Sequence, residues 1–358
     1  EALLFDATGN GFLDLYLASG SIEFDMNNPN FQDRLYINDG KGNFRKSANQ
    51  LPIRLESTSF VKAFDYNEDG HLDLLVGGRS IPFAYGIPLD LRLLENDGKG
   101  NFTDVTDNVA EVFLKTGMTR DAAIADIDGD GEAEIIVVGE WMPIKIFKKV
   151  NGKYEDQSEK FGLAYTGGLW NTIQFLDINN DGKLDFIAGN MGLNTRLKAS
   201  ADKPLQLFIN DFDQNGSIEQ ILTQYEGETS FPLVLKGTLL KQLPSLRKQI
   251  LNYDAYKDKT LTDLFPKVLL ENSLVLDVHT LETQLFINKG DGTFEKSPLP
   301  KLIQSSPVYA IHAEKNEANQ WELMLGGNQS KIKPEIGINM GSFGWMFRGK
   351  DEKNLDLI

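Results

Sequence analysis

The segment DYNEDGHLDLLVGG (65–78) decides the fold, because it places a short acidic loop directly before an apolar run. Its first nine residues carry oxygen-bearing side chains at the first, third, fifth and ninth positions and glycine at the sixth. The aliphatic run that follows is typical of a buried β-strand. Four further segments repeat this order of loop and run, and they begin at Asp6, Asp126, Asp177 and Asp211.

A second motif alternates with the first and predicts a β-hairpin. It reads RLYINDGKGNF (34–44), RLLENDGKGNF (92–102) and QLFINKGDGTF (284–294), and a weaker copy is KIFKKVNGKY (145–154). The Asn-Asp-Gly and Asn-Gly pieces supply the positive φ angles of tight turns. The flanking aliphatic residues supply the two strands of each hairpin.

The repeat length predicts an all-β fold. The first four acidic loops start 59, 61 and 51 residues apart. A unit of that length with about four short strands has the size of a propeller blade. We therefore expect a β-propeller of six or seven four-stranded blades. The expected blades cover residues 1–48, 58–107, 119–158, 170–226, 228–298 and 305–358, and the last lacks the ligand pattern.

Residues 236–276 interrupt the repeat and predict a short helical insertion. Apolar residues recur there at three- and four-residue spacing, at Leu239, Leu243, Leu246 and Ile250. We expect this insertion to cover one end of the propeller. No linker rich in Gly, Ser or Pro divides the chain, so residues 1–358 are expected to form one domain.

The acidic loops have the ligands that Ca²⁺ prefers, which are six to eight hard oxygen atoms in a flexible geometry. A backbone carbonyl at position seven and water would complete each shell. The predicted ligands, at positions one, three, five and nine, are Asp6, Thr8, Asn10 and Asp14; Asp65, Asn67, Asp69 and Asp73; Asp126, Asp128, Asp130 and Glu134; Asp177, Asn179, Asp181 and Asp185; and Asp211, Asp213, Asn215 and Glu219.

We predict about four or five bound Ca²⁺ ions. The third loop, which has four carboxylates, is expected to bind best, and the first is the weakest candidate. An EF-hand is excluded because position twelve is Val76 or Val137 rather than a bidentate Glu. Zinc and copper are disfavoured because the loops contain no soft donor. The alternative for any single loop is an acidic surface turn without metal.

Composition excludes several other classes of function. The formal charge of −16 disfavours nucleic acid and anionic lipid as partners. The chain has no cysteine and three histidines, which exclude disulfides and thiolate sites and disfavour a His-rich metal site. No apolar run is long enough for a transmembrane segment.

The motifs DxNxDGxxD with LDLLVGG and LxxNDGKGNF resemble the FG-GAP/VCBS repeats of integrin α-subunit propellers and of bacterial surface proteins. The segments 137–147 and 168–196 are similar to large bacterial VCBS proteins with an ASPIC/UnbV-type region. The resemblance implies a calcium-binding propeller that is secreted, periplasmic or associated with the outer membrane at the bacterial cell surface. The sequence opens at Glu1, and we expect a monomer or one part of a longer surface protein.

The sequence leaves the molecular function open between three hypotheses. The favoured one is a binding or scaffold module for a protein or glycan ligand, and a purely architectural segment is another. The alternative is a propeller-based polysaccharide lyase or hydrolase, for which Glu140 is the best carboxylate; no catalytic motif is present. Side chains considered for a ligand surface are Trp141, Trp170, Arg79, Asn194 and Arg196, although both tryptophans are more readily explained as packing between blades.

Overall fold

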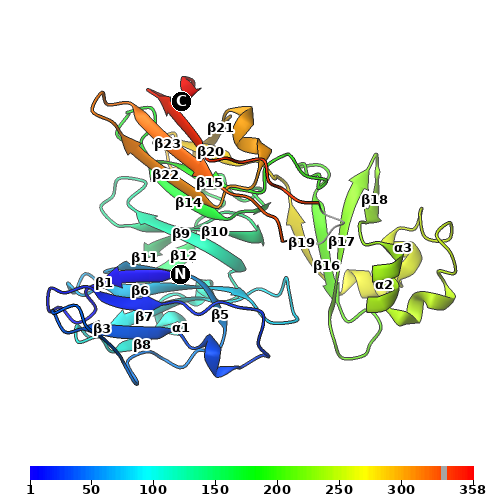
Figure 1. The fold of residues 1–358 in the computed structure, drawn as a ribbon, viewed down its shortest axis with the longest axis horizontal. Coiled ribbons are helices and arrows are strands. Elements are labelled where there is room, and N and C mark those ends of the chain that lie inside the picture. Colours follow the sequence, from blue (N-terminus) through cyan, green and yellow to red (C-terminus); the bar gives the residue numbers. More distant parts are fainter. Residues whose placement is uncertain (332–336) are drawn as a thin grey trace.

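The computed structural model describes residues 1–331 and 337–358, and it is built from antiparallel β-sheets (Figure 1). Helices are few and short, and the longest one described has 7 residues. The prediction of an all-β, propeller-type repeat fold is therefore confirmed. The ring closure and the blade number of six or seven stay predictions.

Five sheets follow the repeat, and we number them along the chain. Sheet 1 contains β1 (Ala2–Phe5), β2 (Asp14–Leu17), β3 (Arg34–Asn38) and β4 (Phe44–Lys46). Sheet 2 contains β5 (Ser57–Phe64), β6 (Asp73–Ser80), β7 (Leu91–Asn96) and β8 (Phe102–Asp104). Sheet 3 contains β9 (Met118–Ala125), β10 (Glu134–Met142), β11 (Lys145–Val150), β12 (Lys153–Asp156) and β13 (Gly168–Leu169). Sheet 4 contains β14 (Thr172–Leu176), β15 (Asp185–Gly189), β20 (Gln284–Asn288) and β21 (Phe294–Ser297). Sheet 5 contains β22 (Ala310–Lys315), β23 (Trp321–Gly326), β24 (Trp345–Gly349) and β25 (Leu355–Leu357).

A sixth sheet, which we call the side sheet, is inserted between β15 and β20. It contains β16 (Leu205–Asn210), β17 (Glu219–Glu226), β18 (Thr229–Pro232) and β19 (Leu274–Val278). The short helices α2 (Lys236–Gln242), η3 (Pro244–Lys248), α3 (Leu261–Leu264) and α4 (Lys267–Glu271) connect its strands. The remaining short helices are η1 (Pro29–Phe31), α1 (Thr106–Val109), η2 (Glu111–Phe113) and η4 (Lys301–Ser305). The side sheet and its helices lie to the right of the other sheets in Figure 1.

The predicted blades 170–226 and 228–298 are wrong in their pairing. The hairpin at 284–294 does not complete a separate blade; its strand β20 pairs with β15, with Phe286 opposite Phe186. Residues 190–283 therefore leave sheet 4 after its second strand and return to it. The fifth acidic loop connects β16 to β17 of the side sheet, so it looks like the start of a blade in the sequence although it belongs to the insertion.

The five numbered sheets stack face to face around their first strands. Strand β1 contacts β5, β5 contacts β9, β9 contacts β14, and β14 contacts β22. Each neighbouring pair shares a hydrophobic cluster, because both faces of the inner sheets carry aliphatic side chains; Phe186 and Phe286 of sheet 4, for example, pack against Ile136 of sheet 3. Among the clusters of the described residues, none joins sheet 5 to sheet 1.

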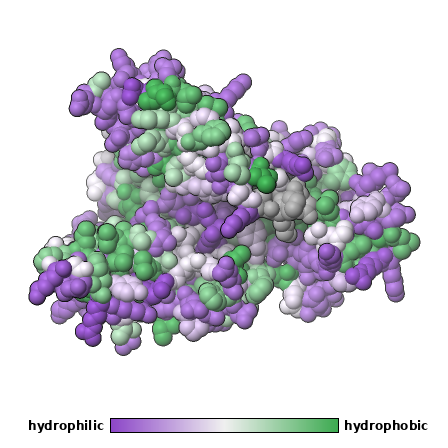
Figure 2. All heavy atoms as spheres, in the orientation of Figure 1, coloured by the Kyte–Doolittle hydropathy of each residue, from purple (hydrophilic) through white to green (hydrophobic). Residues whose placement is uncertain are grey.

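Hydrophobic and hydrophilic surface lie over different parts of the stacked sheets. Leu4 of β1 and Leu13, which directly precedes β2, are exposed, and Figure 2 shows hydrophobic surface at the lower left, where sheet 1 lies. A hydrophilic recess lies between sheets 1 and 2 below and the upper sheets (Figure 2).

Polar bonds join neighbouring sheets at the loop end. Asn96 Nδ2 of sheet 2 donates to Ala7 O in the first loop at 2.9 Å, and Asn288 Nδ2 of sheet 4 donates to Ile127 O in the third loop at 2.7 Å. Lys149 Nζ of sheet 3 donates to Tyr66 O in the second loop at 2.9 Å. In each case the third strand reaches the second residue of the preceding loop, so the loops connect the sheets as well as capping them.

We predict that Asn288→Ala lowers the free energy of unfolding by about 1–3 kcal/mol, because it removes a buried hydrogen-bonding group. The side chain is 4% exposed, and its Oδ1 also accepts the Gly290 N–H at 2.9 Å. Urea unfolding of the variant and of the wild type measures the loss. Asn43→Ala is the control, because Asn43 is exposed and bonds only within its own hairpin turn. Equal effects of the two substitutions would contradict a role for Asn288 in joining sheets.

Candidate metal sites

The five acidic loops have the same internal hydrogen bonds. The first carboxylate of each loop accepts two backbone N–H groups from the fourth to sixth positions; Asp65, for example, accepts from Asp69 at 3.1 Å and from Gly70 at 2.8 Å. The other four loops repeat this arrangement at Asp6, Asp126, Asp177 and Asp211. The fifth side chain in turn accepts the N–H of the seventh residue. The repeated sequence therefore folds into one repeated loop.

Glycine at the sixth position is required by the backbone. Gly70 has a φ of +85°, and a Cβ built there meets nothing within 4 Å. The constraint is therefore conformational rather than steric crowding, because L-residues rarely adopt this left-handed region. The sharp turn directs the preceding side chains toward the same side of the loop.

The acid at the ninth position is buried and joins the loop to the sheet. Asp73 is fully buried; its Oδ2 accepts the Tyr66 N–H of the loop at 3.1 Å, and its Oδ1 accepts the Asn96 N–H of β7 at 2.8 Å. Asp14 and Asp185 make the equivalent pairs of bonds. Burial raises the pKa of Asp73 and of Asp185 to about 6, although the N–H donors oppose the shift.

Glutamate replaces aspartate at the ninth position of the third and fifth loops. Oε2 of Glu134 accepts the Ile127 N–H and Oε2 of Glu219 accepts the Phe212 N–H, each at 2.9 Å. Each of these glutamates keeps its second oxygen for the loop, because only one oxygen bonds to the backbone. Each of these two loops therefore has a ninth-position oxygen that the backbone does not use.

A lysine lies among the acids of the third loop. Lys148 Nζ of β11 is 2.5 Å from Asp128 Oδ2, 2.7 Å from Asp130 Oδ2 and 2.8 Å from Glu134 Oε1. Burial alone would lower the pKa of Lys148, but the three carboxylates outweigh that effect and raise it. An ammonium group thus stands where a bound cation would contact these oxygens. The expectation that the third loop binds Ca²⁺ best rests on its four carboxylates and does not consider competition from Lys148.

The fifth loop brings together three acids without such a lysine. Ligand oxygens of Asp211, Asp213 and Glu219 lie within 4.8 Å of one another. Asp213 Oδ1 is buried and has no hydrogen-bond partner, and burial raises the pKa of Glu219. No lysine or arginine of the described residues forms an ion pair with these three acids. This donor set fits Ca²⁺ well, because the carboxylates converge and one buried oxygen lacks a donor.

The first, second and fourth loops bring the predicted oxygens together with fewer acids. Asn67 Nδ2 donates to Asp69 at 3.1 Å, and Asn179 Nδ2 donates to Asp181 at 3.2 Å. In the first loop Thr8 Oγ1 lies 3.4 Å from Asp14 Oδ2. The third and fifth positions, or the third and ninth, therefore face one another as the ligand pattern requires.

A scan against protein-family models identifies the repeat. The model described as FG-GAP-like repeat matches residues 6–76 and 126–188. This chain contains FG-GAP-like repeats. The matched residues contain the first, second, third and fourth acidic loops, whereas the fifth loop lies outside them. No curated protein matches the chain, and no described helix is long and apolar enough to cross a membrane.

The sequence analysis missed Lys148, although the hairpins contained a signal for it. Lys149 pairs with Tyr154 as Asn96 pairs with Phe102, so Lys148 takes the place that Glu95 has on β7 of sheet 2. Alignment of the weaker hairpin on the others would place a lysine beside the third loop.

The side chains considered for a ligand surface or for catalysis lie in different surroundings. Trp141 and Trp170 are buried in hydrophobic clusters, and so the packing explanation holds for both. Arg79 and Glu140 meet near the first strands, where Arg79 Nη2 is 3.5 Å from Glu140 Oε1. Glu140 Oε2 also accepts the Tyr85 hydroxyl at 2.7 Å, which leaves neither oxygen of the proposed catalytic carboxylate without a protein contact. Asn194 lines a different cavity from Arg79 and donates to Ser305 O at 3.0 Å; Arg196 lines neither of them.

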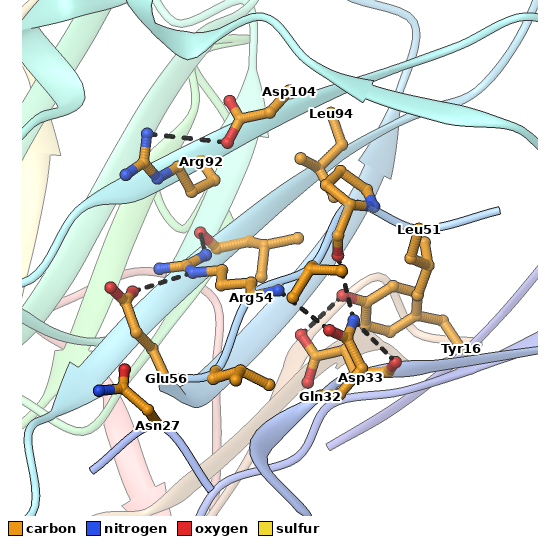
Figure 3. Close-up of a pocket in the computed structure, with 14 residues that line it drawn as sticks. Tyr16, Asn27, Gln32, Asp33, Leu51, Arg54, Glu56, Arg92, Leu94 and Asp104 are labelled. Atoms are coloured by element: carbon orange, nitrogen blue, oxygen red, sulfur yellow. Dashed lines mark hydrogen bonds and ion pairs between the residues drawn. The ribbon is translucent and has the colours of Figure 1, made fainter. Parts of the chain in front are cut away.

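A cavity of about 240 Å³ between sheets 1 and 2 contains a further buried carboxylate, outside the acidic loops (Figure 3). Asp33 accepts the Tyr16 hydroxyl at 2.7 Å, the Thr58 hydroxyl at 2.8 Å and the Ser19 N–H at 2.5 Å. Burial raises the pKa of Asp33, and these donors oppose the shift. Tyr16 belongs to sheet 1 and Thr58 to sheet 2, so Asp33 is a polar connection between the sheets.

We predict that Lys148→Met strengthens Ca²⁺ binding by the third loop about tenfold or more, because the ion no longer competes with an ammonium group. In EDTA the variant should be less stable than the wild type, since the acids then repel one another. Calorimetric Ca²⁺ titration and thermal melts test both effects.

Lys145→Met is the control for this experiment, because Lys145 lies on the same strand and pairs with Asp156, 3.5 Å away, rather than with the loop. Unchanged Ca²⁺ binding in Lys148→Met would show that the lysine does not compete with the ion.

Proposed function

We propose that this protein is a calcium-binding extracellular propeller that acts as a binding or scaffold module for a protein or glycan. The fifth loop supplies the main support, because three acids converge there and one buried oxygen lacks a donor. The other loops add the same backbone with mixed carboxylate, amide and hydroxyl ligands. Hard oxygen donors in a flexible turn favour Ca²⁺ over Mg²⁺, which requires a tighter octahedral shell.

Bound calcium would relieve an electrostatic cost of the fold. The chain carries a formal charge of −16, and five Ca²⁺ ions with ten positive charges would bring it to −6. The ions would also bind the folded chain alone, since the ligands of each loop are brought together by its hydrogen bonds. In this proposal, calcium therefore acts as a structural component of the acidic loops.

The proposed location is outside the cytoplasm, in the periplasm or at the bacterial cell surface. Sites with amide and hydroxyl ligands in place of acids are expected to be weak, and extracellular modules bind Ca²⁺ with Kd values of about 10⁻⁴–10⁻³ M. Such sites would fill in a calcium-rich extracellular medium. FG-GAP-like repeats support this placement, as they are typical of extracellular proteins.

We predict that Ca²⁺ raises the melting temperature and that EDTA lowers it. A single site that is occupied at a hundred times its Kd adds about 2.7 kcal/mol to the stability. Differential scanning calorimetry in Ca²⁺, Mg²⁺ and EDTA measures the effect, and metal analysis after dialysis gives the number of ions. Melting temperatures that are equal in Ca²⁺ and EDTA would refute the proposal.

We further predict that Asp213→Asn removes one Ca²⁺ ion from the measured total and reduces the Ca²⁺-dependent gain in stability. The substitution keeps the size of the side chain and removes the charge of a carboxylate that the fifth loop brings to the site. Asp202→Asn is the matched control, because Asp202 is an exposed aspartate just before β16 and outside the loop. The same metal count in both variants would place the ion elsewhere.

A further inference from the structure

A polar cavity of about 440 Å³ lies where the first strands of the sheets meet. Its lining comes from all five numbered sheets or the residues next to them, and we call it the axial pocket. Its charged and amide lining includes Glu1, Lys62, Arg79, Arg120, Asp121 and Asn171. The volume is within the range of ligand pockets, which is about 300–1,000 Å³.

The axial pocket contains two neighbouring arginines that share one acid. Arg79 Nη2 and Arg120 Nη1 approach the same oxygen of Glu140, at 3.5 Å and 3.6 Å. Burial lowers the pKa of Arg120, and the nearby Arg79 lowers it further. The group therefore carries one more positive than negative charge in a chain whose formal charge is −16. The lining also includes Glu1 and the ion pair of Lys62 with Asp121. With Glu140 counted, three carboxylates therefore balance the three cationic side chains. The two arginines make one side of the pocket locally positive, and that side attracts anions.

The guanidinium groups keep donors for a ligand. Among the described residues, Arg120 makes no side-chain hydrogen bond, and its other contact is with the ring of Tyr309, 5.9 Å from the centroid. The other cation of the pocket is already neutralised, because Lys62 Nζ is 2.8 Å from Asp121 Oδ1. The arginine pair is thus the available anchor, and a guanidinium matches the two oxygens of a carboxylate.

A buried amide supplies independent evidence for a ligand. Asn171 is 9% exposed, and its Nδ2 has no hydrogen-bond partner although it lies in the lining of the axial pocket. An unpartnered donor of this kind is costly. Because Nδ2 is itself buried, a ligand oxygen becomes its partner only when a neighbouring side chain moves aside. Asn171 and the arginines belong to different sheets, and one ligand in the pocket would contact both.

The rest of the lining selects the class of carboxylate. Thr58, Ser59 and Thr172 contribute hydroxyl groups, whereas Ala18 is the one aliphatic side chain that the described residues place in the lining. An apolar carboxylate would find little apolar surface in this lining beyond Ala18 and the ring of Tyr309, whereas a sugar offers hydroxyl groups to the amide and hydroxyl side chains. We propose that the axial pocket binds an acidic sugar, with its carboxylate on Arg79 and Arg120 and a hydroxyl oxygen on Asn171. This inference rests on the proposed binding role and names its ligand class.

The test is isothermal titration of the full chain in saturating Ca²⁺ at low ionic strength, with D-glucuronate as the probe and D-glucose as its neutral counterpart. We expect glucuronate to bind and glucose to bind at least about tenfold more weakly, because the charge-assisted hydrogen bonds are lost. Added NaCl should weaken glucuronate binding. Equal binding of the two sugars, or no binding of glucuronate, would overturn the inference.

Variants locate the site. Arg79→Met and Arg120→Met should each weaken glucuronate binding about tenfold or more, and Asn171→Ala should weaken both sugars. Glu140→Gln should strengthen glucuronate binding, since it removes the competing carboxylate. Arg348→Met is the control and should leave binding within about twofold, because Arg348 pairs with Glu322 on sheet 5 and is absent from the lining.

Arg79 is half-exposed, so Arg79→Met should fold even where Arg120→Met does not; the calcium-dependent melt checks both. Unchanged binding in folded Arg79→Met would overturn the inference. Binding of sulfate or acetate as tight as that of glucuronate would also overturn it, because a simple anion site needs no sugar. Glucuronate binding without any Ca²⁺ binding would instead refute only the calcium part of the proposed function.

Discussion

The rest of the structure depends on the hydrogen bonds that the buried acid at the ninth position of each loop accepts from the backbone. Asp73 shows why: one oxygen holds the second residue of the loop and the other holds the third strand of the sheet. A carboxylate in this position is costly to bury unless donors surround it. The two backbone N–H groups meet that requirement and attach the loop to the sheet. The first carboxylate then holds the turn by accepting two backbone N–H groups of the same loop.

Connections between sheets follow from this anchored loop. The third strand of one sheet reaches the second residue of the preceding loop through Asn96, Lys149 and Asn288. The metal ligands therefore lie at the same rim as the bonds that join the sheets, while the axial pocket lies along the first strands. An ion in a loop would stabilise the alignment of sheets that lines the pocket, because loop and first strand are continuous in the chain.

The sequence predicted the local elements well and the long-range ones poorly. Loops, hairpins and most strands are specified within a few residues by glycine, acid and aliphatic positions, so segments such as 65–78 could be interpreted alone. The pairing of β15 with β20 could not, because residues 190–283 intervene and carry a loop of the same pattern. The contact of Lys148 with the third loop and the proximity of Arg79 to Arg120 depend on which strands become neighbours. The spacing of residues in a single sequence does not contain that information. The packing of Trp141 and Trp170 was the favoured expectation and follows from their size.

The most direct test of the account is a crystal structure of the chain grown in Ca²⁺, with anomalous difference maps that identify the ion. The account predicts a peak in the fifth loop that is bound by Asp211, Asp213 and Glu219, with ligand distances of about 2.3–2.6 Å. Weaker peaks are expected in the first, second and fourth loops, and in the third loop Lys148 and the ion should exclude one another. Ordered loops with no anomalous peak in saturating Ca²⁺ would contradict the account, since the acids would then serve only to shape the turns.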